Sequence, residues 1–128
     1  MAQTERAPAG ILLVDDDPIQ IRIREAILRD AGFRVTIAMS AEAALDLLRE
    51  RRPPDGIRAI VTDHILPGAS GAEFVRMVRN VHADIPIVVI TGLPGAEEEY
   101  EGLGVLFREK PLPPDHLIAT VKSAVGEK

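Results

Sequence analysis

The chain has 128 residues, a formal net charge of −5 and no cysteine. This length suits one domain with a single hydrophobic core, and the lack of cysteine excludes disulfides and thiolate metal sites. The acidic charge and the scarcity of aromatic residues argue against nucleic acid as a partner. No apolar run is long enough to span a membrane, and the N-terminus lacks a secretory-signal pattern, so we predict a cytoplasmic protein without membrane insertion.

Apolar segments of strand length alternate with amphipathic segments of helix length along most of the chain. Residues 1–9 are predicted to form a flexible lead-in, and residues 10–126 the folded domain. Strands are expected at residues 11–14, 33–38, 57–62, 87–90 and 105–107, where short apolar blocks are typical of strands covered on both faces. Apolar stripes at helical spacing are expected to face the core at Ile19, Ile23, Ala26 and Ile27, at Ala41, Ala44, Leu45 and Leu48, at Phe74, Val75, Val78 and Val81, and at Leu117, Ile118, Val121 and Val125.

Capping residues predict where several helices begin and end. Asp17 followed by Pro18 predicts the start of the first helix, Gly32 its end, and Ser40 the start of the second helix. A weaker helix is predicted at residues 96–103, with its glutamates on a solvated outer face. The segment Arg52–Gly56 is predicted to be a surface loop.

The order of a strand followed by a helix, repeated five times, defines the predicted fold class. It indicates an α/β domain with a doubly wound, five-stranded parallel sheet, helices on both faces and right-handed crossovers. In such a sheet, ligands bind outside the carboxyl ends of the strands. The residues at those ends are therefore the first candidates for a functional site.

Polar residues interrupt the apolar pattern where the predicted strands end. They are Asp15, Asp16 and Asp17 after the first strand, Asp63 after the third, Thr91 after the fourth and Lys110 after the fifth. Asp15, Asp16 and Asp63 would repel one another alone, and a hard divalent cation such as Mg²⁺ or Mn²⁺ would relieve that repulsion.

A cation beside a carboxylate also provides what phosphoryl transfer requires, namely charge neutralisation and in-line positioning. Asp63 is the candidate nucleophile, because it is the lone carboxylate at the end of its strand. Thr91 could donate a hydrogen bond to a phosphoryl oxygen, and Lys110 could form an ion pair with it.

Structural explanations compete for the same acids. Asp17 before Pro18 is explained by helix capping, and capping would account for one of Asp15 and Asp16 but not for both. Asp63 could serve only as a turn former ahead of the Pro-Gly pair that follows it.

Together these residues resemble the receiver domain of bacterial two-component response regulators, of the stand-alone, CheY-like kind with a flavodoxin-like (βα)5 fold. The matching segments are ILLVDDDP at 11–18, IVTDHILPGASG at 60–71, IVVITG at 87–92 and FREKPL at 107–112. Each segment alone is a weak signal, but four in the family's order are a strong one. The resemblance extends from about Gly10 to Val125.

The resemblance implies a role for each acid. Asp63 matches the phosphoacceptor, which would be phosphorylated by a histidine kinase or a histidine phosphotransfer protein. Asp16 matches the direct metal ligand, Asp15 the acid that holds the metal through water, and the backbone carbonyl of Ile65 the remaining protein ligand. The metal would be Mg²⁺ or Mn²⁺.

The resemblance also implies a switch. Thr91 and Lys110 match the residues that contact the phosphoryl group, and Phe107 matches the aromatic residue whose rotamer is linked to Thr91. The family usually has a cis peptide bond after the lysine, so a cis bond between Lys110 and Pro111 is expected.

Several departures from the family pattern affect the expected output. Only 18 residues lie between Thr91 and Lys110, about one helical turn fewer than usual, which predicts a shortened fourth helix. This helix is part of the signalling face in many members, and its shortening resembles receivers that serve hybrid sensor kinases. Phe107 lacks the hydroxyl of flagellar-switch receivers, and Leu112 replaces a common phenylalanine, which weakens a chemotaxis-motor function.

Two positions beside the predicted site are apolar, Ile65 and Leu93. Neither side chain can orient an attacking water molecule, and both could hinder its approach. We therefore predict a phosphorylated form that loses its phosphoryl group slowly.

The favoured function is a stand-alone receiver, a monomer or weak dimer that changes its affinity for an unknown downstream protein when Asp63 is phosphorylated, in a two-component pathway or phosphorelay. It would not be an enzyme, because it takes the phosphoryl group onto its own aspartate. One alternative is a phosphatase of the haloacid-dehalogenase type, with Asp15 as nucleophile and Asp17 as acid, although such folds need more chain. Another is a receiver that no longer switches.

Overall fold

The computed structural model describes residues 9–50 and 56–126. A five-stranded parallel sheet forms its centre, in the order β2-β1-β3-β6-β7. The strands are β1 (Gly10–Val14), β2 (Arg34–Ala38), β3 (Ile57–Asp63), β6 (Ile87–Thr91) and β7 (Leu106–Glu109). The predicted lead-in up to residue 8 and the predicted loop, except Gly56, lie outside the described residues.

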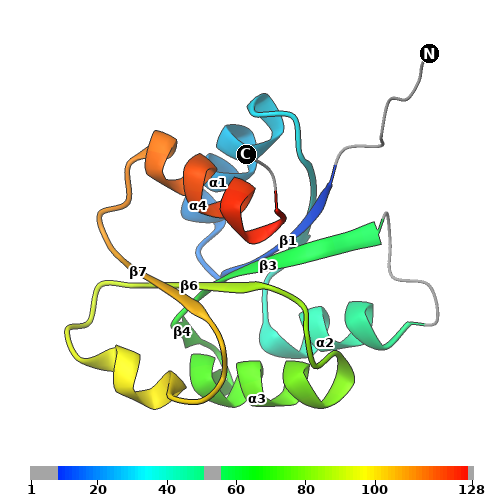
Figure 1. Cartoon of the computed structure of the whole chain (residues 1–128), viewed down its shortest axis with the longest axis vertical. Coiled ribbons are helices and arrows are strands. Elements are labelled where there is room, and N and C mark those ends of the chain that lie inside the picture. The colour runs from blue at the N-terminus through cyan, green and yellow to red at the C-terminus, as the bar shows by residue number, and fades with distance from the viewer. Residues whose placement is uncertain (1–8, 51–55, 127–128) are drawn as a thin grey trace.

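Helices cover both faces of this sheet, as Figure 1 shows. The helices α1 (Pro18–Asp30) and α4 (Pro114–Ala124) lie on one face, and α2 (Ala41–Arg49), α3 (Gly71–Val81) and the short 3₁₀ helix η2 (Ala96–Tyr100) lie on the other. A small antiparallel pair, β4 (Ile65–Leu66) and β5 (Ala69–Ser70), precedes α3. The doubly wound, flavodoxin-like fold is therefore confirmed. None of the described helices is long and apolar enough to cross a membrane.

Side-chain caps fix the starts of three helices. The Asp17 carboxylate accepts hydrogen bonds from the backbone N–H groups of Ile19 and Gln20, with Pro18 as the first helical residue. Ser40 caps α2 in the predicted way, and Ser70 forms a capping box with Glu73 at α3. The capping function of Asp17 is thus confirmed.

The core consists of two clusters, one on each face of the sheet, because successive strand residues point to opposite faces. Leu12, Val14 and Ile60 pack toward α2 and α3 in the first cluster. Ile11 and Leu13 pack toward α1 and α4 in the second. This two-sided burial explains why the central strands contain continuous apolar blocks.

The predicted core stripe of α1 is wrong except at Ile27, which is half-buried and packs against the core. Ile19 and Ile23 are 73% and 55% exposed, while the buried face of the helix carries Ile21, Arg24 and Leu28. The Asp17 cap and Pro18 set where the helix begins, and this start turns positions 21, 24 and 28 toward the sheet. Arg24 can occupy the buried face because an acidic side chain there neutralises it.

The predicted core-facing stripes of α2, α3 and α4 are confirmed, with single exceptions in α3 and α4. The four apolar residues of the α2 stripe are all buried. In α3, Val81 is 39% exposed, because it is the last residue of the helix, and in α4 Ile118 is only half-buried.

The fourth helix is reduced to the five residues of η2, so the predicted shortening is confirmed and the predicted extent to residue 103 is too long. Its start, Gly95, has a φ of 83°, and the chain turns back at once through Gly102 and Gly104, which also have positive φ values. Ala96 and Tyr100 are buried and the three intervening glutamates face solvent, as the acidic pattern predicted.

Candidate functional site

The sheet brings the predicted site residues to one edge. Asp63 and Thr91 are the last residues of the neighbouring strands β3 and β6, Asp15 directly follows β1, and Lys110 directly follows β7. The backbone N–H of Lys110 donates a hydrogen bond of 2.7 Å to the carbonyl of Thr91, which joins two of these strand ends. The peptide bond between Lys110 and Pro111 is cis, as the resemblance implied.

Asp63 is buried, with 7% of its surface exposed, and is held by two neighbours. Lys110 Nζ lies 2.7 Å from Oδ1, and the backbone N–H of Ile65 donates a hydrogen bond of 3.2 Å to Oδ2. The contact between Lys110 and Oδ1 is an ion pair at hydrogen-bonding distance, and no other described residue donates to this oxygen. A buried carboxylate oxygen in this state retains lone pairs for a cation or for an incoming electrophile.

Asp15 is 2% exposed and is surrounded by donors. Its Oδ1 accepts a hydrogen bond of 3.0 Å from the backbone N–H of Asp17, and its Oδ2 accepts bonds from Gln20 Nε2 at 3.0 Å and Arg24 Nη1 at 3.1 Å. Burial lowers the pKa of the Arg24 guanidinium, and the nearby carboxylates, Asp15 first, partly offset this. An arginine remains charged in these conditions, so α1 places a permanent cation beside Asp15.

The remaining predicted metal-side acid, Asp16, is exposed next to Asp15. Among residues 9–50 and 56–126, no three acidic, histidine or cysteine side chains lie close enough to hold a metal as they are arranged. Two of the three predicted carboxylates are instead engaged by Arg24 and Lys110. The donor set of carboxylate and carbonyl oxygens nevertheless fits a hard divalent cation, and Asp63 Oδ1 is a buried oxygen suited to such a ligand role.

The two predicted switch residues lie on adjacent strands. Thr91 is 2% exposed, and its Oγ1 accepts a hydrogen bond of 3.0 Å from the backbone N–H of Leu93. Phe107 on β7 is half-buried, and its ring centroid lies 5.7 Å from that of Tyr100.

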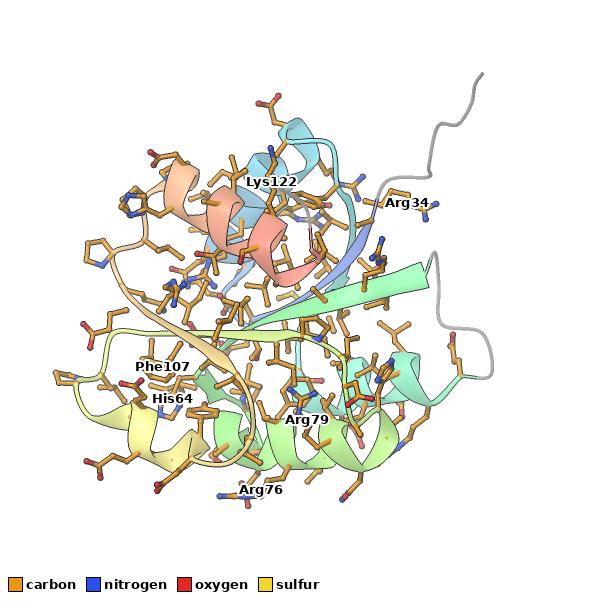
Figure 2. The ribbon with its side chains drawn as sticks, viewed as in Figure 1. Arg34, His64, Arg76, Arg79, Phe107 and Lys122 are labelled. Atoms are coloured by element: carbon orange, nitrogen blue, oxygen red, sulfur yellow. The ribbon has the colours of Figure 1, made fainter. Side chains whose placement is uncertain are left out.

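The contact between His64 and Tyr100 was not predicted from the sequence. His64 follows Asp63 directly, and its Nδ1 lies 2.6 Å from the Tyr100 hydroxyl, while its Nε2 lies 3.8 Å from Glu99. Figure 2 shows His64 near Phe107, on the side of the sheet that η2 covers. Burial, followed by the charges of Glu99 and Asp63, raises the pKa of Tyr100, so its hydroxyl stays protonated where it meets Nδ1.

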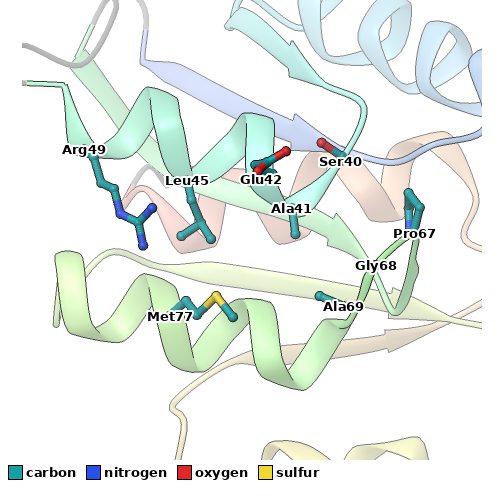
Figure 3. Close-up of a pocket in the computed structure, with 9 residues that line it drawn as sticks. All are labelled: Ser40, Ala41, Glu42, Leu45, Arg49, Pro67, Gly68, Ala69 and Met77. Atoms are coloured by element: carbon teal, nitrogen blue, oxygen red, sulfur yellow. The ribbon is translucent and has the colours of Figure 1, made fainter.

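A shallow groove lies elsewhere, between α2 and α3 (Figure 3). Its volume is about 560 Å³, and Leu45, Arg49 and Met77 are among the residues that line it. It contains none of the predicted site residues, which lie at the carboxyl edge of the sheet.

Comparison with known proteins agrees with this geometry. The family model of the response regulator receiver domain matches residues 11–122. The chain therefore belongs to the response regulator receiver domain family.

Two curated relatives and one solved structure illustrate the similarity. The chain is 37% identical to the hydrogenase transcriptional regulatory protein HoxA of Cupriavidus necator and 33% identical to the transcriptional regulatory protein FixJ of Bradyrhizobium diazoefficiens, in each case over 91% of this chain. It spans 24% of the former and 57% of the latter. It is also similar, with 29% identity and a TM-score of 0.80, to the receiver domain of a sensor histidine kinase from Pseudomonas aeruginosa. The match covers 94% of this chain and all of that structure, which has a magnesium ion in its active-site cleft.

Proposed function

We propose that Asp63 accepts a phosphoryl group from a phosphohistidine on a histidine kinase or phosphotransfer protein, in a two-component pathway or phosphorelay. The observation that carries this proposal is the state of the Asp63 carboxylate. It is buried at the carboxyl edge of the sheet, its Oδ1 is paired with Lys110 at 2.7 Å, and no other described residue donates to that oxygen. A nucleophile needs such an available lone pair.

The transfer breaks the N–P bond of the phosphohistidine and forms an O–P bond to Asp63. The imidazole leaves with its electron pair. Lys110, already at the carboxylate, pairs with a phosphoryl oxygen, and the Thr91 hydroxyl can exchange its bond with the Leu93 N–H for one to the phosphoryl group. A divalent cation held by Asp16, Asp63 and the Ile65 carbonyl would neutralise charge on the phosphoryl oxygens.

The product would act as a signal and not as an enzyme with a separate substrate. Phosphorylation replaces the single negative charge of the carboxylate by about two, which changes the contacts of Thr91 and, through β7, of Phe107. The downstream partner would read that change as a difference in affinity. Because the chain spans about a quarter to about half of the curated relatives described above, a stand-alone, monomeric or weakly dimeric protein remains a prediction.

Intact-mass spectrometry after treatment with acetyl phosphate and Mg²⁺ tests the proposal. We expect the wild-type chain to gain the mass of one phosphoryl group, Asp63→Asn to gain none, and Asp17→Asn, which changes only the helix cap, to behave as the wild type. Beryllofluoride, which mimics the phosphoryl group of an acyl phosphate, should bind to the wild type and to Asp17→Asn but not to Asp63→Asn.

Two results would contradict the proposal in different ways. A mass gain that survives Asp63→Asn and is lost with Asp15→Asn would indicate the phosphatase-type alternative. No gain in the wild type, from acetyl phosphate or from a phosphorylated kinase, would indicate a receiver that no longer switches.

A further inference from the structure

Arg24 is a buried cation inside an acidic site, and the proposed phosphoryl transfer gives it no role. It is 8% exposed, lies on the sheet-facing side of α1 between Ile21 and Leu28, and forms an ion pair of 3.1 Å with Asp15. The other arginines of this helix differ, because Arg22 and Arg29 are 72% and 56% exposed and both pair with Glu25.

The position of Arg24 follows from the charge of Asp15. A guanidinium removed from water needs a partner, because an unpaired buried charge is strongly unfavourable. Asp15 offers the nearest counter-charge, and Gln20 completes the set by donating to the same Oδ2 atom. All the donors that surround Asp15 therefore come from the loop after β1 and from α1.

In this arrangement the Arg24 guanidinium and a bound divalent metal ion would compete for the carboxylate of Asp15. Oδ2 of Asp15 already accepts two hydrogen bonds and Oδ1 accepts one from the Asp17 N–H. A divalent cation that draws on Asp15, directly or through a water molecule, needs some of these lone pairs. It would also bring two positive charges close to a guanidinium that is itself buried.

We propose that Arg24 acts as an internal competitor of the divalent cation for Asp15, and thereby sets the cation affinity of the site. This inference rests on the proposed function of the acid cluster as a metal site. Without the metal, Arg24 neutralises Asp15 and stabilises the fold. When the metal binds, the guanidinium must weaken its hydrogen bond to Oδ2 of Asp15. The free energy lost from that bond makes the binding of the cation less favourable.

The test compares cation binding by the whole chain and three variants. Arg24→Gln keeps a hydrogen-bond donor for Asp15 and removes the charge, Arg24→Lys keeps the charge, and Arg22→Gln makes the same exchange at the exposed arginine of the same helix. Free Mn²⁺, followed by electron paramagnetic resonance, measures the dissociation constant without any phosphorylation. We expect Arg24→Gln to bind Mn²⁺ about tenfold more tightly, because it removes a buried positive charge close to the bound cation, while Arg24→Lys and Arg22→Gln stay close to the wild type.

Thermal unfolding supplies a second signature. Arg24→Gln should unfold at a lower temperature than the wild type without divalent cation, and Mg²⁺ should raise its unfolding temperature by more than it raises that of the wild type. A purely structural arginine would lower the unfolding temperature equally with and without Mg²⁺, and that result would overturn the proposal. Equal or weaker Mn²⁺ binding by Arg24→Gln would also overturn it.

A measurement on the wild-type chain covers the case in which Arg24→Gln does not fold. The nitrogen-15 signals of the Arg24 guanidinium should shift on Mg²⁺ titration and exchange faster with water, while those of Arg22 should not change. Unchanged Arg24 signals at saturating Mg²⁺ would overturn the inference and leave the proposed cation site intact. No cation binding by any of these proteins would instead overturn the cation site itself, and the inference with it.

Discussion

The hydrogen bond between His64 and Tyr100 connects the residue after Asp63 with the shortened fourth helix, and its energy can be worked out from the structure. Both side chains are buried, at 7% and 3% exposure, and Nδ1 lies 2.6 Å from the hydroxyl. In Tyr100→Phe the ring keeps its contact with Phe107, whose centroid is 5.7 Å away. The substitution therefore removes one buried hydrogen bond and little packing.

The expected cost is that of a buried polar atom left without its partner. We expect Tyr100→Phe to lower the free energy of unfolding by about 1–3 kcal/mol, because the buried Nδ1 of His64 then loses its hydrogen-bond partner. The Gly71 backbone packs directly against the hydroxyl, so a water molecule has little space to replace it. Urea unfolding with an unchanged m-value is the assay.

A double-mutant cycle separates this bond from other effects. Tyr100→Phe in a His64→Leu background should cost about 1 kcal/mol less than in the wild type, since the bond is already absent there. Tyr100→Phe that costs less than about 0.5 kcal/mol, with no coupling in the cycle, would refute the reasoning. The link between β3 and η2 would then consist of ring packing alone.

Three further predictions concern other parts of the molecule. Ile65→Asn should shorten the lifetime of phosphorylated Asp63 by about tenfold, because the amide can orient an attacking water molecule. This rate effect is smaller than that of a general base, since an amide cannot accept the proton of the water. Intact-mass spectrometry that follows the loss of the phosphoryl group over time is the measurement. Gly71→Ala should destabilise the fold by about 1–3 kcal/mol in urea unfolding, because its Cβ would lie 2.6 Å from the carbonyl oxygen of His64. Tyr100 is the only tyrosine of the chain, so alkaline titration of tyrosinate absorbance should give a midpoint above the ordinary value. Because the folded-state pKa is raised, this group stabilises the fold below the unfolded pKa of about 10, and that stability is lost as the pH rises further.

The strands and the predicted site residues could be recognised from the sequence for one shared reason. A parallel sheet buries both faces of its central strands, so β1, β3 and β6 contain continuous apolar blocks, and the first polar residue after such a block marks the carboxyl edge. Asp15, Asp63 and Thr91 were found in this way, and the sheet order then placed them together.

The orientation of α1 could not be found in the same way. Counting apolar residues favoured the face with Ile19 and Ile23, which the structure exposes. The inner face includes Arg24, which a hydrophobicity pattern assigns to solvent. Only the position of Asp15 relative to the helix, a tertiary fact, makes an arginine stable there.

The pairing of His64 with Tyr100 shows the same limit at longer range. The two residues are 36 positions apart, and neither has a neighbour in sequence that signals the contact. It depends on where the short η2 returns to the sheet, and that position is set by turns at Gly95 and Gly102 rather than by any residue pattern.

The charges of the site suggest why the cation and the phosphoryl group should bind together. Asp15, Asp16 and Asp63 carry three negative charges, and Arg24 and Lys110 return two positive ones, so the resting site is close to neutral without a metal. A phosphoryl group on Asp63 makes the site more negative by roughly one charge, and a divalent cation then becomes more favourable. Since binding linkage is reciprocal, the cation must stabilise the phosphoryl group by the same free energy. Arg24 and Lys110 would thus give the unphosphorylated site a low affinity for Mg²⁺, and phosphorylation of Asp63 would raise that affinity.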